Sequence, residues 1–464
     1  MSDGREERIA AALADATDTQ VVSIGQGILA SVADVFRRTL GDQPAVVVAD
    51  DNTFDVAGRE VEQRLQAAGV AQARPHVFAG KPTLYAEYGN IETLVTAIRG
   101  HDAVPVAVGS GTLNDIVKRA AYECDRQYMC VGTAASMDGY TAFGAAITKD
   151  GYKRTMTCPA PRAVVGDLDV LTRAPAAMTA SGYADLLAKI TAGADWLVAD
   201  ALDAEKINPG VWSLVQGPLR EATGRPAELN AGDPDAMAGL IEGLVMSGLA
   251  MQAAASSRPA SGAEHQFSHL WEMEGLGHDD DPPLSHGFKV GVGSLAIASL
   301  YERVLVRDLS AVDVRALGHA WPSREEVERR VRRAHTTPGL DDAAVTESLE
   351  KYVAPDELAS RLELLRERWP DLRERLRDQL LSAEDLRAML RAAGCPTSPE
   401  EIGLSRQALK ETFWRAQMIR RRFTVLDLAL QAGILEQCVD ELFAPGGFWA
   451  AASANRLDIR TGRS

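Results

Sequence analysis

The stretch VPVAVGSGTLND, residues 104–115, decides the fold that we expect for this chain. VPVAV is an apolar run typical of a buried strand, and IVKRAAYE at 116–123 continues it with a helical pattern. Gly109 and Gly111 let backbone approach a ligand closely, and the N-terminus of the following helix offers N–H groups and a positive dipole end. This order is typical of a nucleotide-binding turn, although a lone G-x-G is also found in ordinary strand–helix connections.

Similar strands recur along the first third of the chain. Beyond 104–108, strands are predicted at 44–50 (PAVVVAD), 128–132 (YMCVG) and 163–170 (AVVGDLDV), and a helix is predicted at about 56–68. Continuous apolar strands that alternate with helices predict a parallel sheet covered on both faces.

The pattern changes at about Ala174, where long helical stretches replace the strands. Hydroxyl residues with a carboxylate three positions later, at Ser382 and Ser398, predict helix starts in the last third. We therefore expect a Rossmann-like α/β domain at 1–172, an all-helical domain at 173–464, and an active site in the cleft between them.

Composition excludes several classes of protein. The chain has 464 residues and a net charge of −16, with no basic face in its first 300 residues, which argues against a nucleic-acid partner. The N-terminus is charged and no apolar run approaches 18 residues, so no membrane insertion is expected. The cysteines are scattered and odd in number, which fits reduced thiols and a cytoplasmic location: Cys124, Cys130, Cys158, Cys395 and Cys438.

Residues at other strand ends strengthen the nucleotide hypothesis. Asp50 ends a predicted strand, where its carboxylate could accept hydrogen bonds from an adenosine ribose. Thr133-Ala-Ala-Ser136 follows the strand at 128–132 and places hydroxyls and small residues at the same edge of the sheet. Together with 109–115 these residues favour a dinucleotide.

Histidines gather between Ser256 and Gly287, which hold four of the eight in the chain. His265 and His269 are four apart and share one face of a helix, and His286 precedes a glycine. Two imidazoles and one carboxylate from elsewhere would hold a catalytic divalent metal with open positions. The spacing alone leaves open whether there is a metal site, and which histidines would form it.

Several segments, in order, resemble the sn-glycerol-1-phosphate dehydrogenase family, most closely its bacterial branch. They are VAVGSGTLND, VGTAASMDGYTAFGAAI, SGYADLLAKITAGADW, SSRPASGAEHQFSHLWEME, SHGFKVGVG and the tail GLSRQALKETFWRAQMIRRRFTVLDLA. The resemblance covers about residues 20 to 440 and places the chain in a superfamily with glycerol dehydrogenase, iron-containing alcohol dehydrogenases and dehydroquinate synthase.

The resemblance implies that Asp185, His265 and His286 hold one divalent metal, with Asp185 also facing the substrate. It implies that His269 and Asp138 lie beside the substrate. Iron-dependent relatives have a further His one turn after the aspartate, where this chain has Lys189. That departure favours zinc or nickel over iron, without deciding between the two.

The resemblance also implies a set of NAD(H) or NADP(H) contacts: Asp50, Gly109, Gly111, Thr112, Leu113, Asn114, Asp115, Thr133, Ala134, Ala135 and Ser136. Asp50 favours NAD, because a carboxylate repels a 2′-phosphate. Relatives usually have a serine four residues after Asp138, whereas this chain has Ala142 there, preceded by Thr141.

The activity implied is reduction of dihydroxyacetone phosphate to sn-glycerol 1-phosphate, with hydride moving from NAD(P)H to C2 and the metal polarising the carbonyl. Arg258, Lys189 and Lys289 are the candidate partners of the substrate phosphate. The family also implies a homodimer. Alternatives are a dehydrogenase for another polyol, a phosphonate or a sugar-derived ketone, a lyase of the dehydroquinate synthase kind, and a non-catalytic protein that kept the fold.

Overall fold

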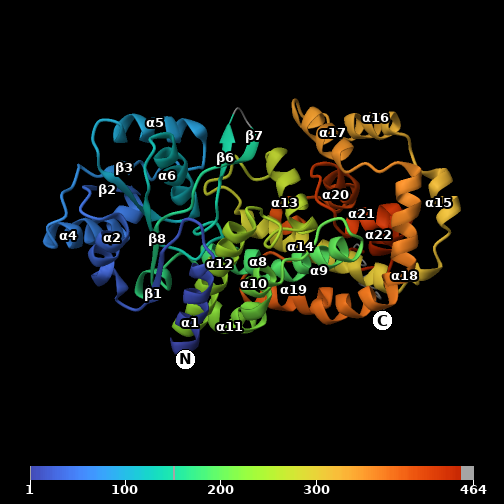
Figure 1. Ribbon diagram of the computed structural model, residues 1–464, viewed down its shortest axis with the longest axis horizontal. Helices are drawn as coiled ribbons and strands as arrows, with labels where there is room; N and C mark the ends of the chain where they lie inside the picture. Colours follow the sequence, from blue (N-terminus) through green and yellow to red (C-terminus); the bar gives the residue numbers. More distant parts are fainter. Residues whose placement is uncertain (1, 150–151, 451–464) are drawn as a thin grey trace, which may run out of the picture.

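Six parallel strands form the sheet of the N-terminal part of the computed structural model, which describes residues 2–149 and 152–450 (Figure 1). Across the sheet they are β1 (Val21–Gly25), β8 (Ala163–Asp167), β5 (Met129–Gly132), β4 (Val104–Gly109), β2 (Ala45–Asp50) and β3 (His76–Phe78). The strands predicted at 44–50, 104–108 and 128–132 are confirmed. The one predicted at 163–170 ends at Asp167, because the Asp167 side chain caps the short helix α7 (Leu168–Leu171).

Helices cover both faces of this sheet, as the apolar strands predict. Alternate side chains of each strand enter two separate cores: Val47 and Val106 pack with α2 (Val32–Leu40) and α4 (Arg59–Ala67). Val46 and Ala107 pack on the opposite face with α5 (Tyr88–Ile98) and α6 (Gly111–Glu123). An antiparallel pair that the sequence did not predict, β6 (Ala145–Lys149) with β7 (Tyr152–Met156), projects beside the sheet.

The described residues from 173 to 450 contain helices and no strand, which confirms the all-helical second part. Its helices are α8 (Ala176–Leu187), α9 (Lys189–Ala201), α10 (Pro209–Thr223), α11 (Pro226–Asn230), α12 (Pro234–Ala254), α13 (Ala263–Met273), α14 (His286–Leu305), α15 (Val314–Ala320), α16 (Arg324–Ala334), α17 (Leu340–Glu350), α18 (Pro355–Gln379), α19 (Ala383–Ala392), α20 (Arg406–Met418), α21 (Val425–Gln431) and α22 (Leu435–Phe443). Ser382 caps α19 as predicted. The helix predicted at Ser398 is wrong, since only one 3-10 turn forms at Glu400–Ile402 and the next helix is capped by Ser405.

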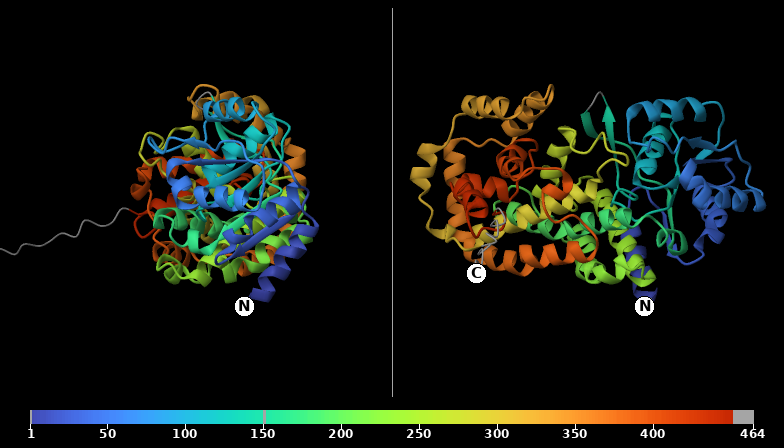
Figure 2. Two further views of the ribbon diagram at one scale, coloured as in Figure 1. Left: turned by 90° about the vertical axis from the view of Figure 1, so that its left-hand side faces the viewer. Right: turned by 180° about the vertical axis from the view of Figure 1, so that it is seen from behind.

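One helix of this part, α12, is long and apolar enough to cross a membrane by length and composition. In the structure 89% of its apolar window is buried, so it is a core helix, which agrees with the expectation of no membrane insertion. The first helix, α1 (Ser2–Ala14), packs against it through ion pairs of Arg5 and Arg8 with Glu242. The first helix of the chain therefore contacts the helical part, and the right-hand view of Figure 2 shows the N-terminus below the place where the two parts meet.

The two parts meet through backbone that lies very close together. A Cβ at Gly182 of α8 would lie 1.9 Å from the carbonyl oxygen of Ala135, in the segment that follows β5. Only glycine permits this approach, because a carbonyl oxygen cannot yield as a flexible side chain can. Gly182 thus sets how closely the helical part approaches the carboxyl edge of the sheet.

Gly182→Ala should lower the stability of the protein by about 1–3 kcal/mol, because the added methyl forces α8 away from Ala135. Gly318 in α15 is a matched control, since a Cβ there meets nothing within 4 Å. Thermal unfolding should show a lower Tm for Gly182→Ala and an equal or higher Tm for Gly318→Ala. An unchanged Tm for Gly182→Ala would contradict the close junction.

Candidate active site

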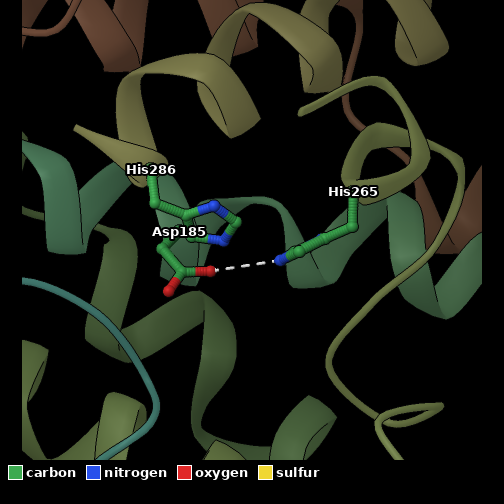
Figure 3. A group of neighbouring side chains, drawn as sticks. All are labelled: Asp185, His265 and His286. Carbon is green, nitrogen blue, oxygen red and sulfur yellow. Dashed lines mark ion pairs between the residues drawn. The ribbon is translucent and has the colours of Figure 1, made fainter. Parts of the chain in front are cut away.

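Three side chains from three helices converge at the junction of the two parts (Figure 3). Asp185 comes from α8, His265 from the first turn of α13, and His286 is the first residue of α14. One ligand atom of each lies within 4.8 Å of the others, and His265 Nε2 is 3.5 Å from Asp185 Oδ1. The structure therefore brings together the three residues that the resemblance implied as metal ligands.

Each histidine is oriented by its own glutamate. His265 Nδ1 donates to Glu264 Oε1 at 2.8 Å, and His286 Nδ1 donates to Glu272 Oε1, also at 2.8 Å. Burial alone would raise the pKa values of both glutamates, but His265 lowers that of Glu264, and Lys153 with His286 holds that of Glu272 well below its usual range. Two ionised carboxylates therefore fix Nδ1 as the protonated nitrogen and leave each Nε2 lone pair for a metal.

Lys189 joins Asp185 to Asp138, which follows β5. Its ammonium is fully buried and lies 2.7 Å from Asp185 Oδ1 and 2.8 Å from Asp138 Oδ2. Burial alone would raise the pKa of Asp185, but Lys189 and His265 hold it far below the usual range. The backbone N–H of Asp138 also donates to Asp185 Oδ2, at 3.1 Å, so the sheet part contacts the ligand directly.

His269 lies beside the three ligands without joining them. Its ring is 5.9 Å from that of His286, nearly parallel to it, and 5.9 Å from that of His265. Burial, followed by the charge of Arg420, lowers the pKa of His269 well below its ordinary value, so this imidazole is neutral near pH 7. A neutral ring beside the ligands can orient a hydroxyl, which is compatible with the substrate role implied for it.

The predicted cofactor residues meet at the carboxyl edge of the sheet. Gly109 is paired in register with Gly132, and Asp50 ends the neighbouring strand β2. The first turn of α6 has no side-chain cap, so its N–H groups are available to a phosphate. One Asp50 oxygen caps a short helix by accepting from the Thr53 N–H at 2.9 Å.

Two predicted cofactor residues are occupied by protein contacts. Asn114 accepts from Tyr128 Oη and donates to the carbonyl of Gly139, and Asp115 accepts from the N–H of Ala146. Both are buried and tie α6 to the segments that follow β5. Asn114 and Asp115 would therefore act on a bound cofactor only indirectly, by fixing the position of α6 at the carboxyl edge of the sheet.

The Thr141 hydroxyl donates to the carbonyl of Val245 at 2.7 Å, so it is engaged with α12. While this hydrogen bond is made, the Thr141 hydroxyl does not replace the hydroxyl of the serine that relatives have at the position of Ala142. Ala135 and Ser136, in the segment that follows β5, lie beside α8, and Ser181 Oγ of that helix donates to the Ser136 carbonyl at 3.2 Å.

The candidate phosphate partners lie in three different settings. Lys189 is held by two carboxylates, as described above. The Arg258 guanidinium is buried: its Nη2 donates to the carbonyl of Asp195, its Nε lies 3.3 Å from Glu205, and its Nη1 has no hydrogen-bond partner among the described residues. Lys289 Nζ donates to the carbonyl of Leu284 at 3.1 Å, and burial lowers its pKa to about 8.

The arrangement suits a divalent cation with two nitrogen ligands and one oxygen ligand, which is the donor set of catalytic zinc sites and also serves nickel. Sequence reasoning missed Glu264 and Glu272 as the partners of the histidines. A signal was present, because His265, His269 and Glu272 are spaced at i, i+4 and i+7 on one helical face.

Comparisons with known proteins identify relatives of this chain. The family model of iron-containing alcohol dehydrogenase matches residues 23–175. Glycerol-1-phosphate dehydrogenase (NAD(P)+) of Bacillus subtilis is 32% identical over 409 residues, which are 87% of this chain and 89% of that protein. The protein of the same name from Geobacillus thermodenitrificans is 32% identical, over 82% of this chain and 85% of its own length. A third, from Halalkalibacterium halodurans, is 38% identical over 55% of this chain, and the match spans 64% of that protein, just under two thirds.

Solved structures share the fold at low identity. A probable glycerol dehydrogenase from Sinorhizobium meliloti matches with a TM-score of 0.58 and 15% identity, over 91% of this chain and 98% of that one. Glycerol dehydrogenase from Schizosaccharomyces pombe matches with a TM-score of 0.57 and 16% identity, over 91% of this chain and 90% of its own. These matches confirm an α/β part followed by a helical part.

Glu272→Gln should weaken metal binding about 10–100-fold, because His286 loses its anionic partner and becomes a less basic ligand. Glu274→Gln is the control, because Glu274 lies just after the last residue of α13 and pairs with Arg415. The dissociation constant of zinc, measured by competition with a chelator on metal-stripped protein, checks this. Equal constants for wild type and Glu272→Gln would contradict the role of Glu272.

Proposed function

This chain belongs to the glycerol-1-phosphate dehydrogenase family, and we propose that it reduces dihydroxyacetone phosphate to sn-glycerol 1-phosphate with NADH. It is an NAD(P)-dependent oxidoreductase acting on CH–OH groups. The observation that carries the proposal is the cluster of Asp185, His265 and His286, which Asp138 contacts from the cofactor side. A metal-ligand set and a nucleotide edge that touch each other suit hydride transfer to a metal-polarised carbonyl.

The chemistry divides between bound groups and the chain. A divalent metal, zinc or nickel, supplies a Lewis acid, and NAD(P)H supplies the hydride. Asp138, whose Oδ2 is fixed by Ser247 Oγ at 2.9 Å, would accept a hydrogen bond from a substrate hydroxyl, and Asp185 would help to hold the metal that polarises the carbonyl. The oxygen that gains charge takes its proton from a water molecule, which the neutral ring of His269 can orient by a hydrogen bond.

Cofactor choice follows from the β2 edge. Asp50 ends the strand, and the neighbouring Asp51 accepts from the N–H of Gly80 at 3.0 Å, so two carboxylates lie at this end of β2. We propose that NADH is preferred over NADPH on this ground.

Lys289 is our first candidate for the substrate phosphate, and Arg258 is the second. Lys289 lies one turn after His286 and has only a carbonyl as its hydrogen-bond partner among the described residues. An ammonium whose hydrogen-bond partner is a neutral carbonyl would gain a charge-assisted contact from a bound anion. The free Nη1 of Arg258 is the reason to keep that residue as a candidate.

We also propose a cytoplasmic homodimer. All five cysteines are free, and burial raises the pKa of Cys130 to about 12 and that of Cys158 to about 11, as suits unreactive thiols in a reducing compartment. The dimer is carried over from the family, and light scattering on the purified protein tests it.

The metal-loaded enzyme should consume NADH with dihydroxyacetone phosphate at a kcat/KM at least about tenfold above that with dihydroxyacetone, because the phosphate contributes a charge-assisted contact. The product should resist oxidation by an sn-glycerol-3-phosphate dehydrogenase, which identifies the sn-1 isomer. Equal kcat/KM for the free ketone would favour another polyol as substrate.

Lys289→Met should raise KM for dihydroxyacetone phosphate roughly tenfold and leave KM for dihydroxyacetone nearly unchanged. Because the pKa of Lys289 is lowered to about 8, its ammonium is charged below that pH and neutral above it. The wild-type KM for the phosphorylated ketone should therefore rise as pH passes through 8 to 9, and Lys289→Arg should remove this rise. Arg258→Met is measured in parallel. If only this variant raises KM for dihydroxyacetone phosphate, Arg258 and not Lys289 is the phosphate partner.

A further inference from the structure

Lys189 holds the same Asp185 oxygen that faces the metal site. Asp185 Oδ1 is 3.5 Å from His265 Nε2 and 2.7 Å from Lys189 Nζ. The other oxygen, Oδ2, is taken by the backbone N–H of Asp138. Any cation bound by Asp185 and His265 therefore shares a carboxylate with a buried ammonium.

Two carboxylates hold the Lys189 ammonium. Lys189 is fully buried, and its second partner, Asp138 Oδ2, lies 2.8 Å away and also accepts from Ser247 Oγ. Lys189 thus places its ammonium between the carboxylate of Asp185, a proposed metal ligand, and that of Asp138, which would face the substrate.

A carboxylate that already binds an ammonium gives less negative charge to a second cation. Two like charges on one carboxylate in a buried site also repel each other more strongly than in water. A metal held there is bound less tightly and keeps more of its own charge, which is the property that polarises a carbonyl.

We propose that Lys189 is a positioning residue that weakens Asp185 as a metal ligand, keeps the bound metal electrophilic and fixes Asp138 toward the substrate. The proposal rests on the function proposed above. In this proposal Lys189 acts on Asp185 and does not bind the substrate phosphate, because the carboxylates of Asp138 and Asp185 already hold its ammonium.

The test uses full-length, metal-stripped Lys189→Met and Lys189→Gln. The zinc dissociation constant is measured by chelator competition without substrate, and kcat and KM are then measured with NADH and dihydroxyacetone phosphate. The dissociation constant should fall about tenfold, while kcat falls about tenfold or more and KM changes by less than about threefold. Tighter metal together with slower turnover is a result that a merely structural lysine would not give.

Lys189→Gln keeps donors for the carboxylates and serves if the methionine variant does not fold. The matched control is Lys351→Met, which removes a partly buried lysine, with 9% of its side chain exposed, that pairs with Asp427 at 2.8 Å in the helical part. Its zinc constant should equal that of wild type. An unchanged or raised zinc constant for both Lys189 variants would overturn the proposal, and so would a tenfold rise in KM with unchanged zinc binding, which would make Lys189 the phosphate partner. Zinc binding is measured without substrate, so failure of the proposed reaction in wild type is a separate result.

Discussion

The carboxylate of Asp185 is the point on which the rest of the structure depends. One oxygen accepts the N–H of Asp138 from the sheet part, and the other faces both Lys189 and His265 within the helical part. Gly182 and Asp185 both lie on α8. Because Gly182 lies so close to the carbonyl of Ala135, Asp185 is brought next to the segment that follows β5. A single buried side chain thereby joins the domain junction, the proposed metal ligands and Asp138, which we propose faces the substrate.

Around that carboxylate the charges are arranged in pairs. Each histidine has its own glutamate, and Glu272 is in turn paired with Lys153 of β7 at 3.1 Å, so His286 is supported from both parts of the chain. Behind His265, burial and the neighbouring Glu264 raise the pKa of Asp195 to about 7, and the hydroxyl of Tyr301 donates to it. Buried networks of this kind favour one geometry, because an unmatched member would carry the full desolvation cost. The protein therefore holds Asp185, His265 and His286 in a fixed arrangement, as a preorganised metal site would require.

Much of the fold could be predicted from the sequence, because its strands are long apolar runs and its helices keep the helical period. Val104–Gly109 illustrates this, whereas β3 at His76–Phe78 was missed because three residues are too few to show a pattern. The site was harder. The sequence alone does not show which of His265, His269 and His286 could bind a metal. The family resemblance implied His265 and His286, and the distances in the structure agree with that choice. Asn114 and Asp115 looked like cofactor contacts, yet their side chains bond to protein, which spacing along a helix cannot reveal. The bridge made by Lys189 depends on Asp138, 51 positions away in the sequence, and only packing places the two together.

We propose that one divalent metal is bound by Asp185, His265 and His286 at the domain junction. Anomalous diffraction from crystals loaded with zinc and NADH, recorded on both sides of the zinc edge, tests this most directly. The account predicts one strong peak within coordinating distance of the Asp185 carboxylate and both Nε2 atoms, with His269 outside the coordination shell. A peak bound by His269 in place of His286, or no peak at the junction in protein that retains activity, would contradict it.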